Sequence, residues 1–248
     1  MPGIDIVGMA VSARTFDEAV KVQDMIAQAI GARHQRPLVD MPNNQGFAST
    51  TGSFDYKILE NVTNMQDAVL ERAALAKFKD FSKVPFGSPH EAARGLFSDL
   101  SDEERAKRVT VELHESDPPT NKSKRLTAIL RDFGCGMAPS QVPETIFGGG
   151  RLHKDEADWL QGAFGMGAKA TFGNARAVVL VTRRAPELLG PGEEDRIAVA
   201  VLLREQRHKT VSTYYLAVNR WNKPGDEADP YSGPPLITRP WNPAHTWH

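Results

Sequence analysis

The sequence has a single cysteine, Cys135, and therefore cannot form an internal disulfide. Its cysteine and histidine residues do not have the spacing of a zinc site. No apolar run approaches the roughly 18 residues that a membrane-spanning helix needs, and the N-terminus lacks the basic segment and long apolar core of a signal peptide. We therefore expect an intracellular, cytoplasmic protein that does not enter a membrane.

The chain also lacks a strong charge of one sign. Its 30 Lys and Arg residues nearly balance 31 Asp and Glu residues, for a formal net charge of −1. This balance argues against a general polyanion-binding surface but leaves room for a local basic patch. Hydrophobic residues make up 40% of the 248 residues and charged residues 25%, as in globular proteins. The length fits one large domain or two small ones.

Apolar residues at helical spacing dominate the first part of the sequence. The pattern predicts one helix over 15–30 and a longer one over 56–79, separated by a turn-rich loop over 40–53. Residues 81–108 read as a loop with a short helix.

The period then changes to the alternation typical of strands. The segment 108–115 shows this alternation, and 125–133 is its expected hairpin partner; 176–184, 196–205 and 210–221 read as three more strands. Helices followed by strands predict an α+β fold, a two-layer sandwich with the helices on one face of a mostly antiparallel sheet.

We divide the chain accordingly into three stretches. Residues 1–55 form an N-terminal helix and loop extension, 56–221 the main domain, and 222–248 a Pro-rich tail that extends over the surface or frays.

The polar face of the predicted helix 56–79 is compact and acidic. At about 100° per residue, Glu60, Asn64, Asp67 and Glu71 fall within about 60° of one another, opposite an apolar stripe. A solvated surface is one interpretation. The other is a site, with a carboxylate able to take a proton and, one turn away, an amide oxygen able to bind a hard cation.

Two glycine-rich stretches follow. "RDFGCGMAP" (131–139) places Asp132, Gly134 and Gly136 at the end of a strand, where a plain turn is also expected. Its Asp-Phe-Gly triplet occurs in protein kinases, but the other kinase motifs are missing.

The second stretch, "GAFGMGAKA" (162–170), matches neither a Walker P-loop nor a dinucleotide-binding fingerprint. Its glycines would nevertheless let backbone N–H groups approach an anion closely, and a lysine follows. The residues concerned are Gly162, Phe164, Gly165, Met166, Gly167, Ala168 and Lys169.

Taken together and in this order, the motifs resemble those of the GHKL ATPases, which include gyrase, the ninety-kilodalton heat-shock chaperones, histidine kinases and MutL. The resemblance covers about residues 56–220. The lysine after the last glycines is similar to the microrchidia-type and chaperone-like branch. The resemblance implies the Bergerat ATP-binding fold, with ATP and Mg²⁺ as ligands.

The resemblance also implies a role for each matching residue. Glu60 corresponds to the base that activates water, Asn64 to the Mg²⁺ ligand, and Asp67 to a supporting position near the pocket. Asp132 corresponds to the adenine reader, with Gly134 and Gly136 letting the base approach. Met137 would pack on the base and Thr182 would reach it through water. The N–H groups of Phe164 to Ala168 and the Lys169 ammonium would hold the phosphates, and residues 139–161 would form a lid.

Two functions remain open on these residues. Glu60 favours Mg²⁺-dependent ATP hydrolysis that drives lid closure and dimerisation around a client protein or nucleic acid, the client being bound outside this chain. Neither His90 nor His114 resembles a phosphoacceptor, so hydrolysis is favoured over phosphotransfer. Many family members complete the site with a lysine from a following transducer domain, for which this chain is too short. That favours the alternative, an ATP-binding switch with negligible hydrolysis. A third interpretation is an unrelated α+β domain.

Overall fold

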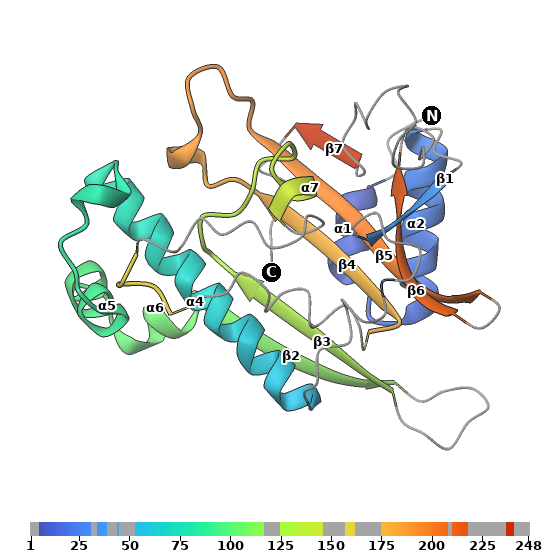
Figure 1. Cartoon of the computed structure of the whole chain (residues 1–248), viewed down its shortest axis with the longest axis horizontal. Helices are drawn as coiled ribbons and strands as arrows, with labels where there is room; N and C mark the ends of the chain where they lie inside the picture. The colour runs from blue at the N-terminus through green and yellow to red at the C-terminus, as the bar shows by residue number, and fades with distance from the viewer. Residues whose placement is uncertain are drawn as a thin grey trace.

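The computed structural model describes residues 5–30, 34–38, 44, 53–116, 125–145, 157–161, 175–207, 210–217 and 237–240. Helices and antiparallel sheets occupy separate stretches of the chain, so the predicted α+β class is confirmed (Figure 1). Among these residues no helix is both long enough and apolar enough to cross a membrane.

The long helix α4 (Phe54–Phe78) confirms the helix predicted over 56–79. Its first turn is capped by Ser53, whose hydroxyl accepts a hydrogen bond from the backbone N–H of Tyr56. It ends at Lys79, which adopts a left-handed conformation with φ of 65°.

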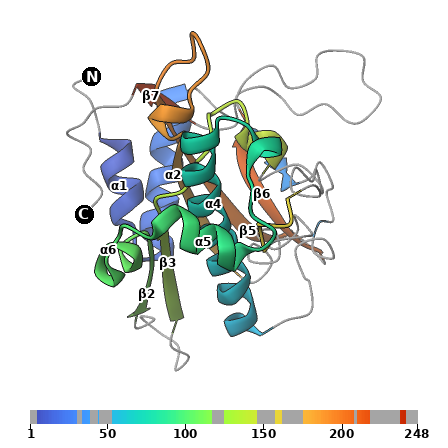
Figure 2. The ribbon, with the colours of Figure 1, turned by 90° about the vertical axis from the view of Figure 1, so that its left-hand side faces the viewer.

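The C-terminal half of α4 packs on a group of short helices, visible in front in Figure 2. These are η2 (Phe81–Lys83) and α5 (Pro89–Phe97). The following helix α6 (Asp102–Ala106) contacts the strand after it. Val69, Leu70 and Ala74 of α4 are buried in this cluster, together with Trp159 and Leu160 from a distant segment.

A two-stranded antiparallel sheet lies beside α4. It consists of β2 (Val109–Ser116) and β3 (Arg125–Asp132), paired with Val109 opposite Asp132, as the hairpin prediction required. The strands pack against α4 (Figure 1), and β3 ends next to the middle of the helix, where Asp132 begins the first glycine-rich stretch.

The larger sheet is antiparallel, with the strand order β1-β6-β5-β4. The central strand β5 pairs with β4 on one side; on its other side its later residues pair with β6 and its first residues with β7. The bounds are β1 (His34–Pro37), β4 (Ala177–Arg183), β5 (Arg196–Arg207), β6 (Thr210–Ala217) and β7 (Ile237–Pro240). A single 3-10 turn, η3 (Pro186–Leu188), follows β4.

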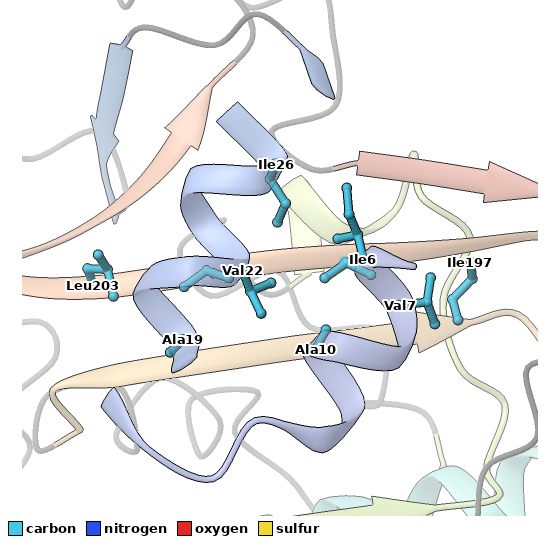
Figure 3. Packing of buried hydrophobic residues seen from close by; sticks show 10 residues of the cluster. Ile6, Val7, Ala10, Ala19, Val22, Ile26, Ile197 and Leu203 are labelled. Atoms are coloured by element: carbon cyan, nitrogen blue, oxygen red, sulfur yellow. The ribbon is translucent and has the colours of Figure 1, made fainter. Parts of the chain in front are cut away.

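Both faces of this sheet are covered. The helices α1 (Ile6–Ser12) and α2 (Phe16–Ile30) pack on the odd-numbered residues of β5, which include Ile197 and Leu203 (Figure 3). The even-numbered residues pack on Leu38 and on α7 (Val142–Thr145). The α1–α2 layer thus covers one face of the antiparallel sheet, and the one-turn helix α7 contributes Val142 to the other face.

The three predicted stretches share one structure. The N-terminal 1–55 contributes α1 and α2 to the core and β1 to the sheet. Four residues of the predicted tail 222–248 form β7 on β5. The boundaries at 55 and 221 thus separate stretches of sequence rather than separately packed units.

Candidate functional site

The first glycine-rich stretch packs directly against the polar face of α4. The N–H of Cys135 donates to the carbonyl oxygen of Ala68 over 2.9 Å, and a Cβ on Gly134 would lie 2.5 Å from that of Ala68. Ala68 is one turn beyond Asn64 and shares its face, because residues four apart in a helix lie above one another. The two motifs, far apart in sequence, are therefore in backbone contact.

The same loop is bonded to the end of β4 on its other side. Ala185 N–H donates to Cys135 carbonyl oxygen over 2.9 Å, and Met137 N–H donates to the Thr182 hydroxyl over 3.1 Å. The Arg184 guanidinium adds a 3.2 Å bond to the carbonyl of Gly136. The structure therefore brings Asp132, the loop after it and Thr182 together beside the Asn64 face of α4.

Glycine is needed at positions 134 and 136 for a different reason from the one that we predicted. We expected them to admit a base, but a side chain at either position would overlap the protein itself. A Cβ on Gly134 would meet Ala68, and one on Gly136 would overlap the carbonyl of Arg183. Gly136 also has φ of +55°, which favours glycine. Both residues serve the close packing of the loop between α4 and β4.

This packing predicts a large difference between two glycine substitutions. Gly136→Ala should lower the free energy of unfolding by about 1–3 kcal/mol more than Gly192→Ala, because overpacking adds to the backbone penalty. Gly192 is the matched control, since its φ is +81° but an added Cβ would meet nothing within 4 Å. Urea unfolding of both variants measures the difference. Equal losses would contradict the tight contact between Gly136 and β4.

Asp132 combines exposure with an unfavourable electrostatic position. Its side chain is accessible to solvent, yet many protein atoms surround it, and this desolvation raises the pKa of its carboxyl, opposed by the Gly134 N–H. That N–H donates to Oδ1 over 2.9 Å. Among the described residues no donor reaches Oδ2, so one carboxylate oxygen is left for a ligand.

Thr182 and Met137 border the same place. The Thr182 hydroxyl is nearly buried and accepts from Met137, so its own proton remains available for donation. Met137 is half-buried against the even-numbered face of β4 and β5, beside Val142. Its sulfur accepts a hydrogen bond from the Thr145 hydroxyl over 3.0 Å. Polar groups and an apolar, polarisable side chain therefore meet at the end of β3.

Asn64 lies one turn and Glu60 two turns before Ala68, toward the N-terminus of α4. Both are partly exposed. The Glu60 carboxylate accepts a hydrogen bond from the Tyr56 hydroxyl, and this bond is the main reason that the pKa of Tyr56 is raised. Within the described ranges the Asn64 amide has no hydrogen-bond partner.

Asp67 is fully buried, and it does more than support a pocket. Its Oδ1 accepts a 2.8 Å hydrogen bond from the backbone N–H of Gln161. Gln161 directly precedes Gly162, the first residue of the second glycine motif. Asp67 thereby fixes the entrance of that motif to α4. The motif itself, including Gly162, Phe164, Gly165, Met166, Gly167, Ala168 and Lys169, lies outside the described residues.

The predicted lid 139–161 is anchored by buried apolar side chains at both ends. Val142 is fully buried against the sheet. At the other end Trp159 is buried and its ring lies 5.4 Å from that of Phe81. Any lid is therefore restricted to 146–156, which the structure does not describe. The adjacent pair Trp159-Leu160 was the sequence signal for an anchor.

Two residues that the sequence patterns did not single out also lie here. Burial raises the pKa of the Cys135 thiol to about 12, with a further contribution from Glu71, so Cys135 stays protonated and unreactive. Lys57 lies on α4 seven residues before Asn64, hence on the same face, and is 2% exposed. In the sequence, the seven-residue spacing between Lys57 and Asn64 could have indicated that Lys57 lies on this face.

No protein-family model, curated protein or solved structure matched this chain.

Proposed function

We propose that this chain binds ATP together with Mg²⁺ and hydrolyses it, in a site between α4 and the ends of β3 and β4. One observation carries the proposal. The loop after Asp132 is hydrogen-bonded to Ala68 of α4 and to Thr182 of β4, so the α4 face, the first glycine-rich stretch and the separately matched Thr182 converge in space. If the short motifs matched by chance, we would not expect their residues to lie close together in the folded chain.

The adenine end of the site would lie at Asp132. Its Oδ2 is available to accept from an exocyclic amine. The Thr182 hydroxyl has a proton to donate, directly or through water, and the Met137 side chain offers an apolar edge to a planar ring. A carboxylate kept in a partly desolvated place, where its pKa is raised, is typical of a functional position.

The phosphate end would lie toward the N-terminus of α4. Mg²⁺ supplies charge neutralisation for phosphoryl transfer and prefers oxygen ligands. The Asn64 amide fits that ion, because its oxygen is a hard donor and is not engaged by another described residue. Asp67 would act indirectly, by fixing Gln161 and with it the start of the second glycine motif.

Glu60 would act as the general base. It would take a proton from a water whose oxygen bonds to the terminal phosphorus, while the bond from that phosphorus to the bridging oxygen breaks and ADP leaves with the electron pair. We further propose that the triphosphate state closes residues 146–156 and pairs two copies of the chain.

The metal assignment predicts a specific loss in Asn64→Ala. Wild-type protein should bind ATP at least about tenfold more tightly with Mg²⁺ than without it, and Asn64→Ala should lose most of that difference, because its metal ligand is gone. Calorimetric titrations in Mg²⁺ and in EDTA measure both affinities. Asn61→Ala is the matched control on the next face of α4. A wild-type protein that binds no ATP would refute the proposed function itself.

A second candidate is an ATP-binding switch with negligible hydrolysis. The hydrogen bond between Tyr56 and Glu60 favours it, since it occupies the carboxylate that would otherwise activate water. The two candidates differ in turnover and not in binding, so the hydrolysis rate of the wild-type chain decides between them.

A further inference from the structure

Lys57 is a buried cation in the long helix α4. It lies in the first turns of α4, its side chain is 2% exposed, and no carboxylate of the described residues forms a salt bridge with it. Lysine is almost never buried unless it is paired, because removing an ammonium from water is unfavourable. The protein layer around Lys57 is thin, so this desolvation is partial.

Lys57 lies on the face of α4 that carries the candidate site. Seven residues separate it from Asn64, which places the two side chains within about 20° of each other around the helix. Glu60 lies between them on the same side. Lys57 is eleven residues before Ala68, or about 16 Å along the axis. It therefore lies at the end of the site that is remote from Asp132.

A second cation, Arg204 of β5, lies within electrostatic range of Lys57. Arg204 continues the even-numbered residues of β5, which face Met137 and Val142 rather than α1 and α2. Its guanidinium has no ion pair or hydrogen bond among the described residues. Repulsion from Arg204 adds to desolvation in lowering the pKa of Lys57.

We propose that Lys57 and Arg204 bind the terminal phosphate of the nucleotide and so select a triphosphate over a diphosphate. This inference rests on the proposed function. Two cations that repel each other in a confined place are stabilised when an anion lies between them, and a phosphate group accepts from both ammonium and guanidinium donors. Neither residue belongs to the motifs that located the site.

The inference predicts a loss confined to the longest nucleotide. Lys57→Met keeps the length and apolar stem of the side chain but removes its charge. It should bind ATP about 10–100-fold more weakly than the wild type, while ADP and AMP affinities change by less than about threefold. Arg204→Met should show the same pattern. Lys77→Met, at the exposed C-terminal turn of α4, is the control and should bind all three nucleotides like the wild type.

A measurement without nucleotide tests the pair independently. Pyrophosphate should raise the melting temperature of the wild type, and this rise should disappear in both Lys57→Met and Arg204→Met. The unliganded variants should melt at or above the wild-type temperature, because Lys57→Met removes a buried charge and Arg204→Met removes the cation that repels it. If one variant does not fold, the other carries the test.

The outcomes separate this inference from the proposed function. Wild-type ratios of ATP to ADP affinity in both variants would refute the phosphate-binding pair and leave ATP binding intact. A wild-type protein that binds no adenine nucleotide would refute the proposed function. In that case loss of the pyrophosphate effect in the variants would still identify an anion site at Lys57 and Arg204, and its persistence would refute the pair as well.

Discussion

Glu60→Ala should reduce single-turnover ATP hydrolysis by about 10²–10⁴-fold while ATP affinity stays within about twofold of the wild type. A general base contributes only when the proton leaves the attacking water, and its removal typically lowers rates by that factor. The contacts proposed for binding lie elsewhere, at Asp132, Asn64 and the phosphates. We therefore expect the hydrolysis rate to fall without a change in affinity, because the rate depends on the Glu60 carboxylate and the affinity depends on other residues.

The design of this experiment follows from the position of Glu60 on α4. Rapid mixing of excess protein with labelled ATP measures the chemical step without product release. Glu60→Gln keeps the shape and the acceptor oxygen for Tyr56 but cannot take the proton, so it should lose as much rate as Glu60→Ala. Glu103→Ala in α6, far from the site and exposed, is the control.

Light scattering on the same samples tests the coupling to assembly. If closure pairs two copies, Glu60→Ala should accumulate as an ATP-bound dimer, because it cannot return to the open state by hydrolysis. Equal slow rates in wild type and both variants, without an ATP-dependent dimer, would instead favour the binding switch.

Tyr56→Phe tests the one observation that favours the switch. If the Tyr56 hydroxyl withholds Glu60 from water, its removal should raise the hydrolysis rate and leave affinity unchanged.

Local pattern alone predicted the elements that carry their own signal. Helix α4 combines an apolar stripe with a serine cap at Ser53, and its observed bounds differ from the prediction by two residues at most. The strands β2 to β6 have seven residues or more each and were likewise located from sequence. Their local signal is alternation in β2 and a continuous apolar run in β4 and β5, which a single sequence displays.

The elements that we missed depend on partners far away in the chain. Strands β1 and β7 have four residues each and show no alternation; they exist because β6 and β5 offer them hydrogen bonds. Burial of Trp159 requires the cluster that α4 forms with α5. The use of Gly134 and Gly136 for packing likewise depends on Ala68 and Arg183, which no local pattern connects to them.

The candidate site likewise has features that local spacing predicts and features that depend on residues far away in the chain. The helical spacing of Glu60, Asn64 and Asp67 predicted a shared polar face, and the loop after Asp132 is hydrogen-bonded to Ala68 beside that face. The spacing could not distinguish Asp67, fully buried and bonded to Gln161, from the partly exposed Asn64. Nor could it reveal Arg204, because a strand residue acquires its neighbours only when the sheet meets the helix.

Asp132→Asn should weaken ATP binding by about 10²-fold and at the same time stabilise the folded chain at neutral pH. The loss of affinity follows from the change of acceptor. An amide presents either a donor facing the exocyclic amine or a weaker neutral acceptor, and a buried mismatch of this kind costs about 2–3 kcal/mol. Calorimetry with ATP measures it, and unchanged affinity in folded Asp132→Asn would refute the adenine assignment.

The gain in stability follows from the raised pKa of the carboxyl. Desolvation makes the ionised form of Asp132 less favourable in the folded state than in the unfolded chain, where the ordinary value is 3.8. The folded protein therefore binds the proton more tightly, and its stability falls as pH rises from that ordinary value through the raised one. Asparagine removes this titration.

The melting temperature of Asp132→Asn should exceed that of the wild type at pH 7, and the difference should vanish at a pH below the ordinary value. Asp99→Asn, at an exposed residue after α5, should show no such trend.

The two results together identify what Asp132 is for. If Asp132→Asn gains stability and loses ATP affinity, the carboxylate at the end of β3 serves recognition of the ligand at a cost in stability. A variant that lost stability and affinity together would instead assign Asp132 to the packing of the loop.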